Sequence, residues 1–248
     1  MNSKKKSVIL RLEAALSFAN TFEKKLATIY HIVASLMEHI FTQKDEKLPK
    51  DTLHACVVQI IGMMRISNSV MHPLLRIMEK EYTTHHHSVN VAFMASLLGN
   101  AMHYTHEQLV DLTYAALLHD IGKIRVENSI LEKPGSLSHE EFESIKHHTK
   151  DSFSILEQNG ITNSSILNAV LLHHEKLDGS GYPKGLLKNE IPPFAQMIGV
   201  CDIFDALTTK RTFRNSYTSY EALMIIKHEM SHQLDFHLVD ILIRMLHE

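Results

Sequence analysis

The stretch Leu118-His119-Asp120-Ile121-Gly122-Lys123 places an imidazole and a carboxylate side by side at the end of an apolar run that starts at Leu112. Next to a helix end, these two groups can share one metal ion, and the second carboxylate oxygen is free to bridge to another metal. Lys123 follows the aspartate by three residues, so its ammonium can reach an anion held there. We therefore predict a metal-dependent phosphohydrolase.

Further histidines and acids lie on, or at the end of, otherwise apolar helical segments. A lone histidine in such a place is usually a satisfied core residue. Asp202 is harder to explain in that way, because a carboxylate inside the apolar stretch 198–204 must be paired, hydrogen-bonded or metal-bound. The candidate metal ligands are His87, His119, Asp120, His148, His173, His174 and Asp202.

This set of donors indicates the metal and the number of ions. Imidazoles and carboxylates without thiolates suit iron, manganese or zinc, and the mixture favours iron or manganese. The set is larger than one ion needs, so we predict two metals bridged by Asp120. Two such metals would hold a hydroxide between them and clamp the oxygens of a phosphodiester during in-line displacement.

Other residues are candidates for binding the substrate. Lys123 could neutralise a phosphate oxygen. Arg211 and Arg214 could hold a second phosphate by forked contacts. The loop Asp178-Gly-Ser-Gly-Tyr-Pro-Lys-Gly185 is rich in glycine, so its backbone can approach a ligand closely, and a planar group could lie against Tyr182.

The elements that must position these residues are predicted to be helices. Period-two alternation is not sustained anywhere in the chain, and helix signals recur, so the fold class is all-α. Thr105 can cap a helix that ends at His119. Ser138 and Glu141 fit a capping box, and Gly160 ends the helix that follows. A last helix is expected to begin at Ser219 or Tyr220.

The N-terminal segment shows a different spacing. Residues 1–44 lack glycine and proline, and their apolar residues alternate steps of four and three. We predict one long helix there, which either pairs with its copy in a homodimer or packs on the rest of the chain. Asp51 or Thr52 is expected to cap a second helix that runs to about Val70. The heptad positions are Val8, Leu12, Ala15, Ala19, Phe22, Leu26, Ile29, Val33, Leu36 and Ile40.

Composition bounds the class of protein. The chain has 248 residues, 44% hydrophobic and 21% charged, with a net charge of -3, so it can bury a core and gives no electrostatic case for binding nucleic acid or an anionic membrane. Its two cysteines cannot make a disulfide framework. A signal core and an apolar run long enough to span a membrane are not seen, so we expect a cytoplasmic protein.

Taken together, His119-Asp120-Ile-Gly-Lys123, His173-His174-Glu175 and Asp178-Gly-Ser-Gly-Tyr-Pro183 resemble the HD-GYP family, a branch of the HD superfamily of metal phosphohydrolases. The resemblance runs from about residue 79 to the C-terminus. It implies an all-helical catalytic domain in 79–248, and residues 1–78 are then left as a helical N-terminal region. It also implies hydrolysis of the bacterial second messenger cyclic di-GMP to linear pGpG, and then to GMP if cleavage continues.

The resemblance also implies roles for single residues. It gives metal-ligand roles to the seven candidates above, phosphate contacts to Lys123, Arg211 and Arg214, and a guanine or loop contact to Gly181 and Tyr182. Family members with three metals carry a glutamate four residues before the first histidine. Thr83 stands there, whereas Glu81 lies four residues before His85, so a two-metal centre is favoured over one in which Glu81 or His85 takes part.

Two other functions stay open. Metals and phosphate clamps recognise phosphates more than bases, so the substrate could be another cyclic dinucleotide or a nucleotide phosphate. A receptor that binds cyclic di-GMP without turnover, and signals through the N-terminal helices, would carry the same residues. The complete ligand set favours the enzyme.

Overall fold

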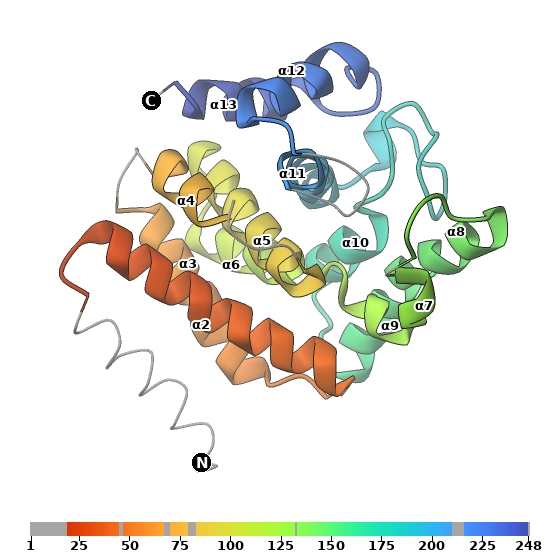
Figure 1. Cartoon of the computed structure of the whole chain (residues 1–248), viewed down its shortest axis with the longest axis horizontal. Coiled ribbons are helices and arrows are strands. Elements are labelled where there is room, and N and C mark those ends of the chain that lie inside the picture. The colour runs from red at the N-terminus through yellow and green to blue at the C-terminus, as the bar shows by residue number, and fades with distance from the viewer. Residues whose placement is uncertain are drawn as a thin grey trace.

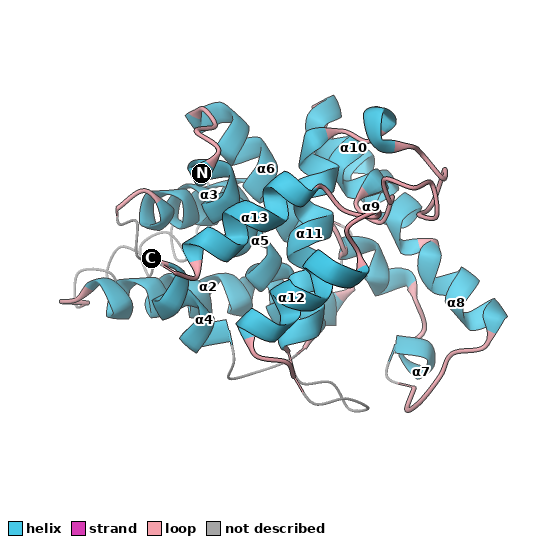
Figure 2. Ribbon diagram, turned by 90° about the horizontal axis from the view of Figure 1, so that it is seen from above, coloured by secondary structure: helices cyan, strands magenta, loops and turns pink. Residues whose placement is uncertain are grey.

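The fold is all-α, as predicted from the sequence. The computed structural model describes residues 19–44, 47–66, 70–78, 83–131, 133–209 and 216–247. Within these ranges the chain forms helices and a single isolated antiparallel bridge, between Asp178 and Leu187, and no strand (Figures 1 and 2).

The N-terminal half contains α2 (Phe22–Gln43), α3 (Lys50–Met64), α4 (Met71–Met78), α5 (Thr84–Ala101), α6 (His106–Leu118) and the 3-10 helix η1 (Ile121–Arg125). The C-terminal half contains α7 (Asn128–Leu131), α8 (His139–Lys146), α9 (His148–Gln158), α10 (Ser164–Leu172), the 3-10 helix η2 (Lys188–Glu190), α11 (Pro193–Thr208), α12 (Ser219–Glu229) and α13 (Phe236–Met245).

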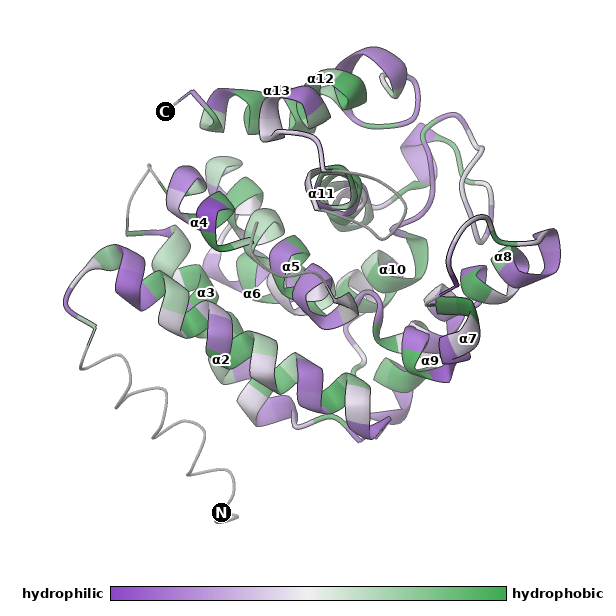
Figure 3. Ribbon diagram, in the orientation of Figure 1, coloured by the Kyte–Doolittle hydropathy of each residue, from purple (hydrophilic) through white to green (hydrophobic). Residues whose placement is uncertain are grey.

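Helix α5 is the centre of the bundle. Every residue from His86 to Gly99 is buried, as expected for a helix surrounded by others. Helices α2, α3, α4, α6, α11 and α13 all contact it. Helix α11 lies on the opposite side of α5 from α2, is mostly apolar, and is covered by α12 and α13 (Figures 1 and 3). Helix α6, which His119 follows, and helix α11, which contains Asp202, therefore both pack on α5.

One hydrophobic core joins the two halves of the chain. It extends from Leu26 of α2 to Leu242 of α13 and includes residues on both sides of the predicted boundary at residue 78. The division into an N-terminal region and a catalytic domain stays a prediction.

The N-terminal helix differs from the prediction. Instead of one helix over residues 1–44, α2 begins at Phe22, because Thr21 is extended (φ -121°, ψ 161°) and its hydroxyl accepts a hydrogen bond from the Lys24 amide at 3.3 Å. The heptad residues Leu26, Ile29, Val33 and Ile40 are buried against the bundle. This side of α2 therefore packs within its own chain; Val8, Leu12 and Ala15 lie outside the described residues.

Other helix ends were predicted with mixed success. The cap at Thr105 and the capping box at Ser138 are confirmed, and Thr105 also forms a capping box, with Gln108. Helix α3 begins at Lys50, directly after Pro49, so the predicted cap at Asp51 or Thr52 is wrong, and the helix ends at Met64 instead of about Val70. The predicted last helix is two helices, because Asp235 caps a second one by accepting a hydrogen bond from the His237 amide at 2.8 Å. None of the described helices is long and apolar enough to cross a membrane.

Candidate metal centre

Three histidines of the predicted site stand at helix ends, and the local backbone fixes their rings. His119 follows α6, His173 follows α10, and His148 lies where α8 meets α9. In each, Nδ1 lies 2.6–2.7 Å from the carbonyl oxygen three residues earlier. A carbonyl can only accept, so Nδ1 must carry a proton, and the lone pair of a neutral ring then lies on Nε2. Each imidazole therefore presents a free metal-binding nitrogen.

His87 is held by side chains from other elements. It lies in the first turn of α5, and its Nδ1 is 2.7 Å from Oδ2 of Asp205 on α11. The other oxygen of Asp205 accepts hydrogen bonds from Asn90 at 2.7 Å and from Thr209 at 3.2 Å. Asn90 in turn accepts a hydrogen bond from the Tyr30 hydroxyl at 2.6 Å. His87 thus presents Nε2 to the site in the same way as the other histidines.

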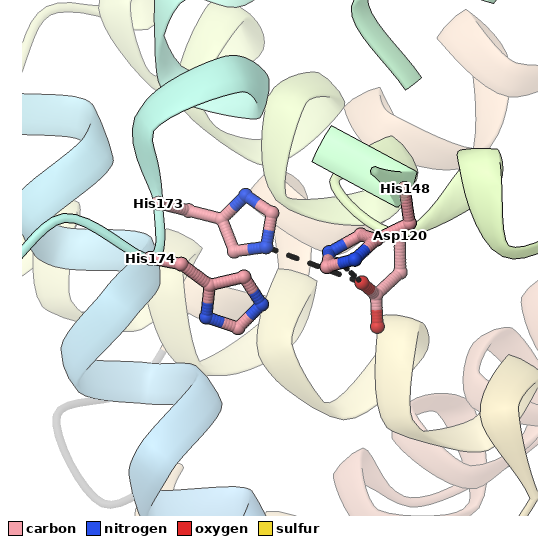
Figure 4. A group of neighbouring side chains, drawn as sticks. All are labelled: Asp120, His148, His173 and His174. Carbon is pink, nitrogen blue, oxygen red and sulfur yellow. Dashed lines mark ion pairs between the residues drawn. The ribbon is translucent and has the colours of Figure 1, made fainter. Parts of the chain in front are cut away.

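All seven predicted ligands come together, in two adjacent groups. The His148 group comprises Asp120, His148, His173 and His174, and three of its members are fully or almost fully buried (Figure 4). The His87 group comprises His87, His119 and Asp202. Within each group the potential ligand atoms all lie within 4.8 Å of one another.

Asp120 joins the two groups. Its Oδ2 lies 3.3 Å from Nε2 of His119 and 3.6 Å from Nε2 of His87. Its Oδ1 lies 3.1 Å from Nε2 of His148 and 4.0 Å from Nε2 of His173. One carboxylate oxygen therefore faces each group, which is the arrangement that a bridging ligand requires.

Asp202 also reaches both groups. Its Oδ1 is 3.1 Å from Nε2 of His87, and its Oδ2 is 3.6 Å from Nδ1 of His174. It comes from the middle of α11, so its backbone is fixed by the bundle on both sides. The predicted need for a partner of this carboxylate is met by these two imidazoles.

Unsatisfied buried atoms test whether a cation fits. Oδ1 of Asp120 and the Nε2 atoms of His119, His148 and His173 are buried and make no hydrogen bond within the described part of the chain. Buried polar atoms are nearly always paired, so four neighbouring exceptions need an explanation. All four can donate an electron pair to a metal, and the donor set suits one.

The charge states of the acids and of two histidines also suit a cation. Burial would raise the pKa of Asp120, but the charge of Lys123 and the contact with His119 hold it well below its usual range. Burial, assisted by the neighbouring imidazoles, lowers the pKa of His173, and burial lowers the pKa of His174 to about 3. Deprotonated acids and neutral imidazoles are the forms that bind metals.

His87 is the exception. Burial lowers its pKa, but the hydrogen bonds and charges of Asp202 and Asp205 outweigh burial and raise it to about 10. Two carboxylates therefore create a strongly negative potential at this imidazole. A metal ion placed among the Nε2 atom and the carboxylates would satisfy the same potential in place of the proton.

Three glycines allow the backbone to approach the histidines of the His148 group. A Cβ on Gly122 would lie 2.1 Å from the His148 carbonyl oxygen, and one on Gly199 would lie 2.7 Å from that of His173. One on Gly181 would lie 2.3 Å from the Lys176 amide nitrogen and 2.5 Å from the carbonyl oxygen of His174. Glycine is therefore required at these positions for packing.

A buried serine also holds the segment around Gly122 in place. Ser152 is fully buried. Its hydroxyl accepts a hydrogen bond from the Gly122 amide at 2.7 Å. The serine thereby fastens η1 to α9 beside His148.

The glycine-rich loop is anchored by a buried acid. Glu175 accepts hydrogen bonds from the Lys184 amide at 2.7 Å and the Leu186 amide at 2.9 Å. The Tyr182 ring stacks on His174, with ring centroids 4.7 Å apart. Lys146 of α8 lies 5.5 Å from the centre of the Tyr182 ring. The loop therefore packs directly on a candidate metal ligand, and Tyr182 lies at the edge of the centre.

The remaining predicted residues lie as follows. Nζ of Lys123 is 2.5 Å from Oδ2 of Asp120, so the lysine is beside the centre and partly exposed. His85 belongs to neither metal-binding group. Thr83, four residues before His87, caps α5. Arg211, Arg214 and Glu81 lie outside the described residues.

Sequence reasoning missed the residues that support the ligands. Glu175 is a buried acid in a motif that was recognised, and an acid inside an apolar helix was the available signal for Asp205. Asn90 and Tyr30 carry no such signal, because their roles depend on contacts across 115 and 60 residues of sequence.

Comparisons with known proteins agree with this geometry. The sequence model of the family described as HD domain matches residues 67–238. This chain belongs to the HD domain family. Its motifs place it in the HD-GYP branch, as predicted. The family is metal-dependent, and the His and Asp cluster is where a metal could bind.

Two bacterial phosphodiesterases are similar to this chain over most of its length. A cyclic di-GMP phosphodiesterase of Thermotoga maritima is 32% identical over 85% of this chain and 52% of its own length. A 3'3'-cGAMP-specific phosphodiesterase 1 of Vibrio cholerae is 31% identical over 94% of this chain and 55% of its own length. The chain spans about half the length of these relatives.

A solved structure shares the fold. Bd1817, a HDG"Y"P protein from Bdellovibrio bacteriovorus, superposes with a TM-score of 0.76 at 20% identity, covering 100% of this chain and 80% of that one. At this identity the likeness concerns the fold alone, including the helices that precede the predicted catalytic domain.

Proposed function

We propose that this chain is a metal-dependent phosphodiesterase that hydrolyses cyclic di-GMP to linear pGpG, with GMP as the product of any second cleavage. The observation that carries this proposal is the position of Asp120, whose two oxygens face two separate groups of metal-binding side chains. The names of relatives such as the Thermotoga maritima enzyme support cyclic di-GMP as the substrate.

Each proposed ligand has a position that suits its task. A pair of divalent ions bound here activates water and neutralises the charge that develops on a phosphodiester. His87, His119 and Asp202 would hold one ion, and His148, His173 and His174 the other, with Asp120 between them. Iron and manganese fit the mixture of imidazole and carboxylate donors.

Two ions are proposed in preference to three. Thr83 occupies the position where a third-metal glutamate would stand, and its hydroxyl is engaged in capping α5 through the His86 amide at 3.3 Å. Thr83 also contacts the His86 ring nitrogen at 2.8 Å. A hydroxyl that caps a helix offers little to a third cation.

The substrate contacts follow from the surroundings of the two groups. Lys123 is partly exposed beside Asp120, where its ammonium could contact a phosphate oxygen of a bound substrate. Tyr182 stacks on His174 at the edge of the centre, where a guanine could meet the tyrosine or its loop. Arg211 and Arg214 are proposed as contacts to a second phosphate on their residue types and motif.

A second substrate is favoured by a specific observation. The 3'3'-cGAMP-specific relative covers 94% of this chain, and cyclic di-GMP and 3'3'-cGAMP present the same phosphodiester ring. A centre that recognises phosphates does not by itself separate them. We place cyclic di-GMP first because it is named for several relatives of different bacteria.

The test is a turnover assay with both dinucleotides. The protein is purified without oxygen, loaded with manganese or ferrous iron, and the products are separated by chromatography. Linear pGpG or GMP, absent with the His119→Ala/Asp120→Ala variant, is the expected result. If the loaded protein leaves cyclic di-GMP intact but cleaves 3'3'-cGAMP, then 3'3'-cGAMP replaces cyclic di-GMP as the proposed substrate. Binding of cyclic di-GMP without cleavage of either would indicate the receptor.

We also propose a homodimer, but with a shorter contact between the copies than the sequence suggested. The described part of α2 packs its apolar side within the chain, so a contact between copies would use the heptad positions Val8, Leu12 and Ala15. Light scattering on the full chain and on a variant lacking residues 1–18 tests this. A dimer that survives the deletion would reject it.

A further inference from the structure

His87 differs from the other buried histidines of the centre in the hydrogen-bond acceptors that are available to its Nδ1. His119, His148 and His173 donate to carbonyls in the last turn of a helix, where carbonyl groups lack partners within the helix. His87 stands in the first turn of α5, where the unpartnered backbone groups are N–H donors. Its ring therefore needs an acceptor from elsewhere in the fold.

We infer that Asp205, Asn90 and Tyr30 form a hydrogen-bonded relay that positions His87 for metal binding, so that the N-terminal helix α2 contributes a residue to the support of the centre. This inference rests on the proposed function of the site as a metal centre. Asp205, Asn90 and Tyr30 are positioning residues, because none of them belongs to either metal-binding group.

The direction of every hydrogen bond in the relay is determined. Asp205 is an acceptor when ionised, so Asn90 must present its amide nitrogen to it, at 2.7 Å. The amide oxygen of Asn90 then faces Tyr30, whose hydroxyl must donate to it, at 2.6 Å. The remaining oxygen of Asp205 accepts from Nδ1 of His87 at 2.7 Å. Nε2 of His87 is left to face Asp202 and Asp120.

The packing gives the relay little freedom. Tyr30, Asn90, His87 and Asp205 are each at most 4% exposed, and they come from α2, α5 and α11. The ring of Tyr30 is stacked near His86 and tilted against Phe93, with centroids 6.2 Å and 5.7 Å away. A carboxylate that accepts from the far nitrogen of a metal-binding histidine fixes the ring and raises its basicity. The position of Tyr30 on α2 is thereby transmitted to a metal ligand.

The experiment measures metal affinity of the full chain, independently of turnover. Manganese(II) is titrated into metal-free protein by calorimetry, and His87→Ala and His148→Ala identify the binding step of each group. The relay variants are Asp205→Ala, Asp205→Asn and Tyr30→Phe. The control is Tyr114→Phe, because Tyr114 is also buried and its hydroxyl makes no hydrogen bond to any described residue.

The expected result is a selective loss. The binding step that is lost in His87→Ala reports the His87 group. Asp205→Ala should weaken the manganese affinity of this step by about 10–100-fold, the effect usual for such supporting partners. Asp205→Asn should weaken it less, because its amide oxygen can still accept from His87. Tyr30→Phe should cause a smaller but measurable loss, and Tyr114→Phe none. The step that His148→Ala removes should keep its affinity in all of them.

Two results would overturn the relay. One is equal manganese affinity in Tyr30→Phe, Asp205→Ala and Tyr114→Phe. The other is an equal loss in both steps that follows the melting temperature of each variant, which would mean a general structural effect. A parent protein that binds no manganese would reject the proposed metal centre itself, and is distinguished from both.

Discussion

The two groups of the metal centre contain the same residue types but differ in how they are supported. Glycines place backbone against the residues of the His148 group, and carbonyls three residues earlier in the chain fix the rings of His148 and His173. The ring of His87 is held by Asp205, 118 residues away in the sequence, which in turn accepts a hydrogen bond from Asn90. Local main-chain support is readable in a sequence motif, whereas long-range side-chain support is not.

The difference also concerns tolerance to change. A glycine packed on a backbone carbonyl cannot accept a side chain without moving a helix. A hydrogen-bonded relay can lose one member and still leave the ring in place, less firmly. Substitutions around the His148 group should therefore have larger effects than those around the His87 group, unless they touch the residue that both share.

Asp120 is that shared residue, and its loss should have the largest effect. Asp120→Ala removes one ligand oxygen from each group, so we expect metal content and turnover to fall by more than about 100-fold, the upper end of the losses caused by supporting residues. Metal analysis of the purified variant and the turnover assay measure this. Asp240→Ala, which breaks only a surface ion pair with Arg244 on α13, should change neither.

Gly122→Ala should be the next most damaging. The new Cβ would lie 2.1 Å from the His148 carbonyl oxygen, so η1 and α9 must separate. We expect a loss of about 3 kcal/mol in the free energy of unfolding, with weaker manganese binding in the His148 step. Urea titration and calorimetry measure the two effects.

Gly62→Ala is the matched control for that substitution. Gly62 lies exposed within α3 and a Cβ there meets nothing within 4 Å. Alanine should stabilise the helix by about 0.5–1 kcal/mol. If Gly122→Ala proved as stable as Gly62→Ala, this would contradict the close contact between η1 and α9 at Gly122.

Much of the centre could be predicted because its ligands interrupt apolar helices, as Asp202 does in α11. The cap at Thr105 and the capping box at Ser138 were predictable because a cap involves residues that are close in the sequence. The start of α2 at Phe22 was missed because the heptad spacing continues through Thr21, whose capping hydroxyl stops the helix. Asn90 and Tyr30 could not be recognised, because only the folded bundle brings α2, α5 and α11 together.

Glu175→Gln should loosen the glycine-rich loop while leaving both groups of ligands in place. The glutamine keeps one acceptor but turns an N–H group towards an amide that Glu175 now satisfies. We expect a loss of about 1–3 kcal/mol in the free energy of unfolding and a higher KM. Glu190→Gln is the control, because Glu190 also accepts a loop amide, from Leu187 at 2.8 Å, but is exposed. An unchanged KM in Glu175→Gln would contradict the anchoring role.

Substitutions of Tyr182 should have the smallest effect on metal affinity, and two variants separate the contribution of its ring from that of its hydroxyl. Tyr182→Phe keeps the ring stacked on His174, so metal affinity should stay as in the parent. Tyr182→Ala removes a stacked pair worth about 0.5–1.5 kcal/mol, which is at most about tenfold in affinity. Manganese titration checks both. Equal affinity in all three proteins would mean that the stacking does not position His174.

In the metal-loaded protein, Asp120 should lie between two metal ions. Diffraction from crystals of the manganese-loaded protein, collected at the manganese absorption edge, locates the ions. Two anomalous peaks are expected, one among Asp120, His87, His119 and Asp202, and one among Asp120, His148, His173 and His174. A single peak, or peaks away from Asp120, would show that Asp120 does not bridge two metals.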